Sequence, residues 1–178
     1  MSNFEWNRDY LSTHKAKAAG VISVLIIRYL YMMIFIYGFF HKLVHGWMWN
    51  DIITQRFLTM YHTLQAAALH DDSLAARIAG LQAGYMQYFA IPLSMPIAWI
   101  VTIGELIVGL SMLLGIATRR NAVFGLFLLL NFAAGGYYNF TIPILVFMSL
   151  LIILLPTGQW LGLDKKLSRQ HPQSPWFK

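Results

Sequence analysis

The sequence contains no cysteine and has few charged residues. Without cysteine, the chain can form no disulfide bond and can supply neither a thiolate nucleophile nor a cysteine ligand for an iron–sulfur cluster or a metal. Charged residues make up only 11% of the chain, whereas hydrophobic residues account for 58%. Soluble domains average about a quarter charged and about half apolar residues. A soluble fold of this size cannot bury so much apolar surface, so the composition predicts an integral membrane protein.

The motifs of common enzyme families are also absent. The sequence has no glycine-rich dinucleotide loop, no P-loop, no His-Glu-x-x-His and no serine elbow. The net charge of +6 is not accompanied by a basic-aromatic module, so we expect no nucleic-acid binding. The basic residues are expected to orient the chain and to contact anionic membrane lipid. We predict no metal site, and the sequence shows no firm set of ligands for a cofactor, so it does not decide whether a haem or pigment is bound.

Four apolar segments predict an all-α, integral membrane four-helix bundle that forms a single domain over residues 1–178. The first segment would extend about 34 Å at 1.5 Å per residue, which is enough for one crossing. Gly135-Gly136 and Pro156-Thr157-Gly158 predict the ends of the last two helices. The predicted spans are residues 18–40, 95–116, 121–139 and 141–160.

Basic residues are distributed unevenly between the ends of these spans. Three segments share one side of a bundle with an even number of spans, and they hold nine of the thirteen lysines and arginines: Arg8, Lys15, Lys17, Arg119, Arg120, Lys165, Lys166, Arg169 and Lys178. Cytoplasmic segments carry the excess of basic residues in membrane proteins. We therefore expect a multi-pass protein of a prokaryotic inner membrane with both termini in the cytoplasm.

The long connection between the first two spans, residues 46–93, contains two apolar stripes at helical spacing. The first comprises Ile53, Phe57, Tyr61, Leu64 and Ala68, and the second comprises Leu74, Ile78, Leu81, Tyr85 and Phe89. The stripes predict two amphipathic helices on the extracytoplasmic side. These helices would lie on the membrane surface, cap the bundle or form a docking face, and periodicity alone does not separate these roles.

Each predicted span carries one polar side chain at a similar depth: Arg28, Glu105, Asn131 and Ser149. Because a charged group in hydrocarbon needs a partner, we expect Arg28 and Glu105 to form a buried ion pair. This polar layer would either fix the register of the helices or serve as a proton or electron-acceptor site.

A second candidate site lies at the outer boundary of the membrane. His41 and His45 are four residues apart on one helix face, but two histidines are too few for a closed zinc site. Interfacial histidines that contact water are the simplest interpretation. Alternatively, they would form the rim of a quinone or substrate pocket together with Lys42, Tyr137 and Tyr138.

Three groups of residues occur in a characteristic order. The first group comprises Arg28 and Gly38 to Leu43, the second extends from Gly104-Glu105 to Thr118-Arg119, and the third, after the last span, is Gly162-Leu163-Asp164. This order resembles the DoxX/DoxD family of four-helix membrane proteins. The long first connection and the ending Trp160–Asp164 are most similar to DoxD, the membrane subunit of a thiosulfate:quinone oxidoreductase.

The resemblance implies a membrane subunit of a quinone-linked oxidoreductase that acts on thiosulfate or a similar sulfur oxyanion. Quinone would be its substrate, and other protein subunits would supply the chemistry that a cysteine-free chain lacks. The alternative is a non-catalytic structural or accessory subunit of a larger respiratory or photosynthetic membrane complex. The sequence alone does not decide whether the chain is catalytic.

Overall fold

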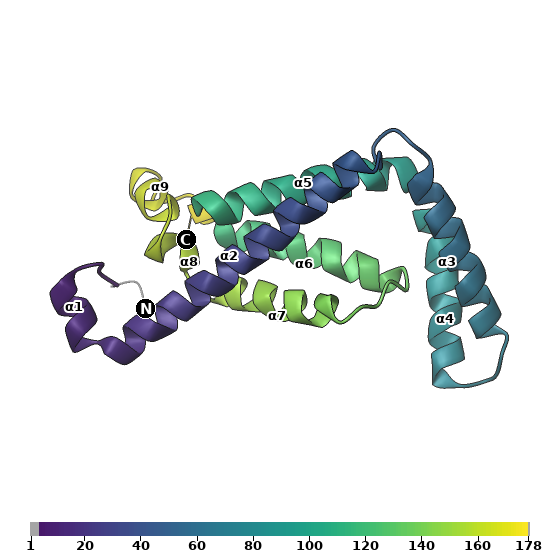
Figure 1. Cartoon of the computed structure of the whole chain (residues 1–178), viewed down its shortest axis with the longest axis horizontal. Helices are drawn as coiled ribbons and strands as arrows, with labels where there is room; N and C mark the ends of the chain where they lie inside the picture. Colours follow the sequence, from purple (N-terminus) through teal and green to yellow (C-terminus); the bar gives the residue numbers. More distant parts are fainter. Residues whose placement is uncertain (1–3, 178) are drawn as a thin grey trace.

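The computed structural model describes residues 4–177, which contain helices and turns but no β-strand, so the all-α prediction is confirmed. Four helices lie side by side and form a bundle (Figure 1): α2 (Lys15–Val44), α5 (Ser94–Leu114), α6 (Thr118–Ala134) and α7 (Thr141–Leu154). The closest pairs are α2 with α5 and α6 with α7, and contacts of α5 with α6 and of α2 with α7 complete the bundle.

Further short helices lie at both ends of this bundle. One end, the terminal end, carries α1 (Arg8–Thr13), α8 (Thr157–Trp160), α9 (Asp164–Gln170) and the short η2 helix (Pro175–Phe177). At the opposite end, the hairpin end, α3 (Ile52–Ala68) and α4 (Leu74–Tyr85) run crosswise to the bundle as a helical hairpin (Figure 1). A π-helical segment, η1 (Met86–Ala90), continues α4 toward α5.

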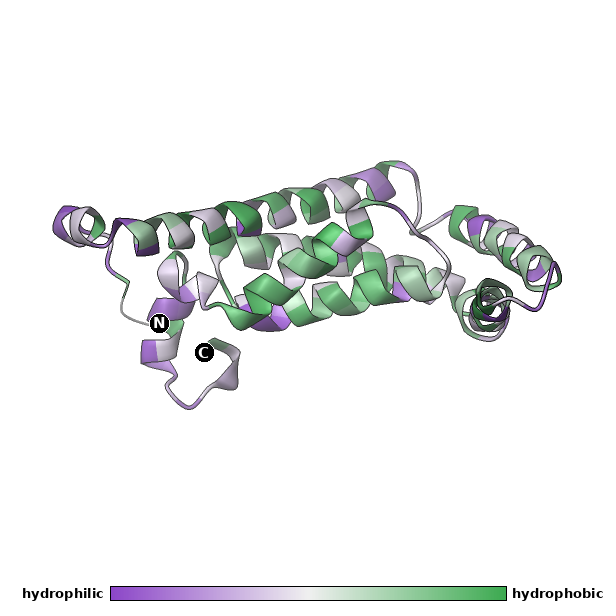
Figure 2. Ribbon diagram, turned by 90° about the horizontal axis from the view of Figure 1, so that it is seen from below, coloured by the Kyte–Doolittle hydropathy of each residue, from purple (hydrophilic) through white to green (hydrophobic). Residues whose placement is uncertain are grey.

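Two helices, α2 and α5, are long and apolar enough to cross a membrane, whereas α7 is apolar but shorter. Only 28% of the most apolar stretch of α2 is buried, unlike the core helix of a soluble protein. Figure 2 shows hydrophobic residues along the length of the bundle and more hydrophilic residues toward its two ends. The described residues thus include two candidate membrane-spanning helices.

The last predicted span, residues 141–160, is divided in the structure. Helix α7 ends at Leu154, and Leu155 is extended with φ −106° and ψ 141°. Pro156 explains the break, because proline lacks a backbone N–H and disfavours helical geometry in the residue before it. The chain then turns into the separate helix α8.

The core of the bundle is formed by large apolar side chains from all four helices: Tyr31, Phe35, Val108, Met112, Leu128 and Ile152. A polar contact crosses this core, because the Tyr31 hydroxyl lies 2.7 Å from Ser149 Oγ. Ser149 donates its own proton to the Leu145 carbonyl, so Tyr31 is the donor in this contact. The contact fixes the position of α7 against α2.

The first apolar stripe of the connection packs against the bundle. Ile53, Phe57 and Leu64 of α3 are buried in a second hydrophobic cluster that also includes Ala98 of α5. The hairpin therefore covers one end of the bundle. Capping the bundle was one of the roles predicted for the two amphipathic helices.

The second stripe does not pack in the same way. Helix α4 buries small residues, including Ala79 and Ala83, because it lies close to α3. By contrast, Leu74 is 75% exposed and Leu81 is 77% exposed. Tyr85 belongs to the same stripe and reaches Asn131 on α6, so the stripe faces the bundle side of the hairpin.

Candidate functional site

A buried ion pair joins α2 and α5 in the half of the bundle nearer the hairpin. Lys42 Nζ lies 2.6 Å from each carboxylate oxygen of Glu105, and each residue is only 8% exposed. Helical side chains tilt toward the N-terminus of their helix, so the amine of Lys42 points back into the bundle rather than out toward the hairpin end. The carboxylate of Glu105 is thus neutralised by Lys42.

The predicted pair of Arg28 with Glu105 is therefore wrong. Glu105 lies level with Gly38 of α2, and Arg28 is roughly 15 Å farther along that helix at 1.5 Å per residue. The side-chain tilt also directs Arg28 toward the terminal end, away from Glu105. There Arg28 is fully buried. Its Nη1 donates to the carbonyls of Thr157 (2.8 Å) and Leu161 (2.7 Å).

The other two members of the predicted polar layer lie apart from the ion pair. Asn131 Oδ1 accepts from the Tyr85 hydroxyl at 3.0 Å, and Ser149 is bonded to Tyr31. Burial raises the pKa of Tyr85, so its hydroxyl stays protonated and acts as the donor. Arg28, Glu105, Asn131 and Ser149 each have a different partner, and the single shared layer that we predicted does not form.

Gly38 permits the close approach of Glu105 to α2. A Cβ atom at position 38 would lie 2.8 Å from Glu105 Oε2 and 3.1 Å from Oε1. These distances are shorter than a normal van der Waals contact, and the carboxylate cannot move freely because Lys42 holds both oxygens.

We therefore expect Gly38→Ala to destabilise the protein by about 1–3 kcal/mol, the usual cost of overpacking a core. Thermal unfolding in detergent would measure this loss. Gly20→Ala is the matched control, because it lies in the same helix and its Cβ would meet no atom within 4 Å. That control should stabilise the helix by up to about 1 kcal/mol. Equal effects of the two substitutions would contradict the close packing at Gly38.

A cavity of about 320 Å³ lies beside the ion pair. This volume is at the lower end of the range of about 300–1,000 Å³ for pockets that bind small molecules. Residues of α2, α5, α6 and α7 line its sides, and α3 covers it from the hairpin end. The lining includes Ile34, Tyr37, Lys42, Trp47, Arg56, Glu105, Phe132, Tyr137, Ile142 and Leu145.

Two buried donors in this lining have no hydrogen-bond partner among the described residues: Trp47 Nε1 and the Tyr137 hydroxyl. Buried polar groups are nearly always paired, so these donors in the cavity wall are free to bind the acceptor atoms of a ligand or of water. Two cationic groups lie close to the ring of Trp47. Lys42 Nζ is 5.0 Å and Arg56 Cζ is 5.6 Å from the ring centroid. Together with Glu105, these are the charged groups of the lining, so its net charge is positive.

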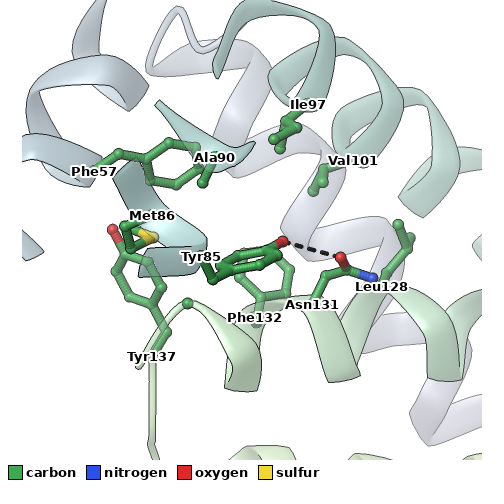
Figure 3. A pocket seen from close by; sticks show the side chains of 11 residues that line it. Phe57, Tyr85, Met86, Ala90, Ile97, Val101, Leu128, Asn131, Phe132 and Tyr137 are labelled. Carbon is green, nitrogen blue, oxygen red and sulfur yellow. Dashed lines mark hydrogen bonds between the residues drawn. The ribbon is translucent and has the colours of Figure 1, made fainter. Parts of the chain in front are cut away.

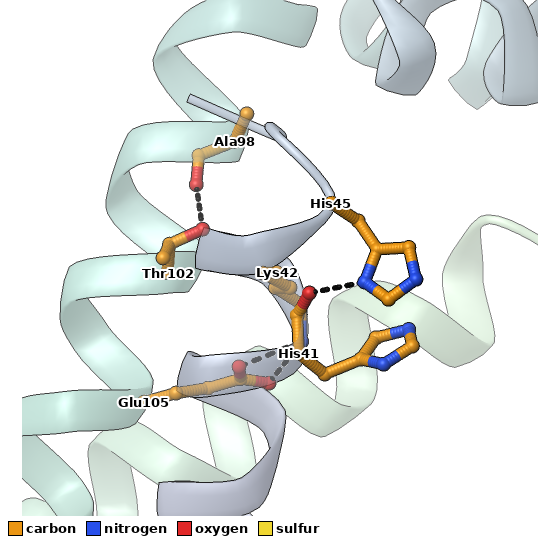
Figure 4. A network of polar contacts seen from close by, with 6 residues as sticks. All are labelled: His41, Lys42, His45, Ala98, Thr102 and Glu105. Carbon is orange, nitrogen blue, oxygen red and sulfur yellow. Dashed lines mark hydrogen bonds and ion pairs between the residues drawn. The ribbon is translucent and has the colours of Figure 1, made fainter. Parts of the chain in front are cut away.

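Of the predicted rim residues, Lys42 and Tyr137 line the cavity but His41, His45 and Tyr138 do not. Figure 4 shows the two histidine rings side by side and directed away from Glu105. Their ring centroids are 4.1 Å apart, and His45 Nδ1 donates to the His41 carbonyl at 2.7 Å. Tyr138 instead accepts a hydrogen bond from Gln82 of α4. Helical geometry separates His41 from Lys42, since neighbouring residues of α2 point to different faces, whereas Tyr137 and Tyr138 lie in the connection between α6 and α7.

Two site residues were not predicted as such: Gly38 and Arg56. Arg56 lies on the polar face of the amphipathic α3. The sequence signal for a role of Arg56 was its position directly before Phe57, which belongs to the apolar stripe and is buried in the structure. Its role became visible only because α3 folds back over the bundle.

A second, smaller cavity lies between the hairpin and the bundle (Figure 3). Its volume is about 40 Å³, and its walls are mostly apolar apart from the Tyr85–Asn131 hydrogen bond. A space of this size holds a few water molecules and is far below the size of a small-molecule pocket. The larger cavity is therefore the candidate ligand site. Within residues 4–177, no three His, Asp or Glu side chains are grouped to hold a metal ion.

At the terminal end, Asp164 holds the beginning of α6. Its carboxylate accepts from the backbone N–H of Ala117 (2.7 Å) and of Thr118 (3.2 Å) and from Thr118 Oγ1 (3.0 Å). Gly115 and Gly162 touch beside it, since a Cβ on either residue would lie 2.6 Å from the Cα of the other. Arg28 binds the neighbouring Leu161 carbonyl, so residues from three distant segments meet here. We call this cluster the Asp164 cluster.

No family model matches the chain, and no curated protein or solved structure is significantly similar to it. The resemblance to the DoxX/DoxD family therefore stays a prediction.

Proposed function

We propose that the chain is a multi-pass membrane subunit of a quinone-linked oxidoreductase and that it binds the quinone head group in the cavity beside Lys42 and Glu105. The cavity carries this proposal, because it combines a buried ion pair, unpaired donors and apolar walls. The quinone-linked reaction comes from the resemblance to DoxX/DoxD proteins, and the cavity offers a site of suitable chemistry for it.

In this proposal α6 and α7 also cross the membrane. They would span about 26 Å and about 21 Å at 1.5 Å per residue, somewhat less than the usual hydrocarbon thickness of about 30 Å. Such short spans fit a locally thinned bilayer. Their outward side chains support this placement, because Phe127 and Phe147 are large, apolar and more than half exposed.

The hairpin then lies at the extracytoplasmic membrane surface. Because Tyr85 reaches α6, the rest of its stripe faces the membrane side of the hairpin, where lipid would cover the exposed Leu74 and Leu81. The terminal end would be cytoplasmic by the distribution of basic residues.

The cavity has the arrangement expected for an amphipathic ligand that arrives from the bilayer. Its wall between α2 and α7 includes Tyr37, which is 70% exposed, and Ile34, which is 40% exposed. An apolar tail could leave along this side, while the ring carbonyls would accept hydrogen bonds from Tyr137, Trp47 and Lys42. Arg56 would close the cavity on the side of the hairpin.

Reduction of a quinone to a quinol consumes two electrons and two protons. With thiosulfate as donor, two thiosulfate ions form one tetrathionate ion through a new sulfur–sulfur bond and release the two electrons. A partner subunit would perform this oxidation and pass on the electrons, since this chain has no thiol. The Lys42–Glu105 pair and Tyr137 would hold the quinone oxygens and hand on protons taken from the outer aqueous side.

Titration with a short-tailed ubiquinone analogue tests the proposal on the purified protein in lipid nanodiscs. We expect saturable binding that Tyr137→Phe weakens about tenfold, because one hydrogen bond in a buried site is lost. Tyr138→Phe is the matched control, since Tyr138 does not line the cavity. Equal affinity of the Tyr137→Phe variant and the wild type, or no binding to the wild type, would contradict the proposed site.

The exposed apolar stripe of α4 favours the structural or accessory role as a second candidate. In that case Leu74, Ile78 and Leu81 would contact another membrane subunit instead of lipid. Stoichiometric co-purification with a large complex that keeps full activity after loss of this chain would support that role and contradict the enzymatic one.

A further inference from the structure

A groove at the terminal end lies far from the cavity and is not used by the proposed function. Its volume is about 850 Å³, and it runs along α6 beside Ile153 of α7. Basic residues form its head and apolar residues its floor: Arg119, Arg120, Val123, Phe124, Phe127 and Trp176.

Among residues 4–177, no carboxylate compensates the charge of the two arginines at its head. Arg119 Nη2 donates to the Leu154 carbonyl at 3.2 Å, while its buried Nε has no partner there. Arg120 Nε donates to the Pro175 carbonyl at 3.1 Å. These contacts hold both guanidinium groups at the groove and leave donors for an anion.

The C-terminal segment forms one wall of this groove. The guanidinium of Arg120 lies 4.4 Å from the centre of the Trp176 ring, and Trp176 is still 54% exposed. Below the arginines, Val123 and Phe127 are 52% and 55% exposed and extend the apolar surface along α6 toward the middle of the bundle. The groove thus presents positive charge at one end and an apolar strip along its length.

We infer that this groove binds one anionic phospholipid of the inner leaflet, with its phosphate at Arg119 and Arg120 and an acyl chain along Val123 and Phe127. Arginine donors match phosphate oxygens in geometry and charge. A phospholipid matches both the basic end and the apolar strip of the groove, whereas a soluble phosphate would leave the apolar strip uncovered. The inference rests on the membrane placement proposed above but not on quinone binding.

Fluorescence quenching in nanodiscs tests the inference directly, because Trp176 lies in the groove. Mixed phosphatidylcholine and phosphatidylglycerol discs would carry bromine on the upper acyl chain of one lipid or of the other, at equal amounts. The fluorescence of Trp176 is obtained by subtracting the emission of the Trp176→Phe variant from that of the wild type. We expect brominated phosphatidylglycerol to quench it at least about twofold more than brominated phosphatidylcholine, because two basic residues at a lipid surface favour an anionic head group.

Matched variants identify the residues responsible. The preference should disappear in Arg119→Gln/Arg120→Gln and persist in Lys165→Gln/Lys166→Gln, which removes two exposed charges from α9 at the same end. Arg119→Lys/Arg120→Lys should keep a preference for the anionic lipid, because lysine retains the charge, and this would show that the loss in the glutamine variant is due to charge and not to misfolding.

Three results would overturn the inference. These are equal quenching by the two lipids, a preference that survives in the glutamine variant, and loss of the preference when inorganic phosphate replaces chloride at equal ionic strength. The quinone titration uses the same nanodiscs, so its failure alongside an intact lipid preference would reject only the proposed function. Absence of quenching by either lipid would reject the groove while leaving quinone binding to be judged separately.

Discussion

Replacement of Glu105 by leucine is expected to destabilise the protein by about 3–5 kcal/mol, because it leaves the amine of Lys42 buried without a counter-charge. The pair is 2.6 Å apart and nearly inaccessible to solvent, so water cannot replace the lost carboxylate. Lys42→Met should cause a loss of similar size for the same reason. Unfolding in a mixed-detergent titration measures both changes.

The double variant Lys42→Met/Glu105→Leu separates pairing from simple damage to the core. When both charges are replaced by apolar groups of similar volume, most of the stability should return. Arg28→Met/Glu105→Leu is the control, and it should be at least as unstable as Glu105→Leu, because Arg28 binds Thr157 and Leu161 instead. Rescue by the Arg28 substitution, and not by the Lys42 substitution, would contradict the observed pairing.

Asp164→Asn is expected to cost about 2–4 kcal/mol. The carboxylate accepts three hydrogen bonds at the beginning of α6, and an amide nitrogen in place of one oxygen would face the N–H of Thr118. Hydrogen bonds to charged groups contribute about 1.5–3 kcal/mol each, and the three are not additive. The shift in the unfolding midpoint in detergent is the measurement.

Asp9→Asn provides the control for this change. Asp9 is exposed in the first turn of α1, so its substitution should alter stability by no more than about 0.5 kcal/mol. If Asp164→Asn had an equally small effect, the Asp164 cluster would not be what holds the C-terminal segment on the bundle.

Much of the helical architecture follows from the sequence because apolar runs and turn residues are local signals. The predicted range 95–116 lies within two residues of α5, which starts at Ser94 and ends at Leu114. The C-terminal boundary arises from Gly115, which adopts a φ of +66°. For α6, we predicted a start near Asn121, but the helix begins at Thr118. The group that satisfies its first N–H groups is Asp164, far along the chain and invisible to local patterns.

The ion pair could be predicted only in part. Because Glu105 is a charged residue within an apolar span, the sequence correctly indicated that it needs a cation as partner. The choice of Arg28 was wrong because depth was counted along the helices without the direction in which their side chains tilt. Lys42 was placed at the membrane boundary, where lysine usually reaches outward to water.

The residues that suggested the family resemblance are brought together by the fold in two places. Gly38, Lys42 and Glu105 meet at the candidate site, while Arg28, Thr118 and Asp164 belong to the terminal end. Their spacing in the sequence gave no indication of this division, because contacts between helices depend on rotation about each helix axis. One group of these residues therefore lies at the candidate ligand site, and the other group holds the helices together at the terminal end.

Photoaffinity labelling with an azido-quinone tests most directly whether the cavity between α2 and α7 is the quinone site. The account predicts covalent label on peptides that contain Ile34 to Lys42 or Tyr137 to Leu145, with competition by unlabelled quinone. The Lys42→Met/Glu105→Leu variant, which should keep its fold, is expected to show much less label. Label confined to residues outside the cavity lining, or label in the cavity that unlabelled quinone does not displace, would contradict the account.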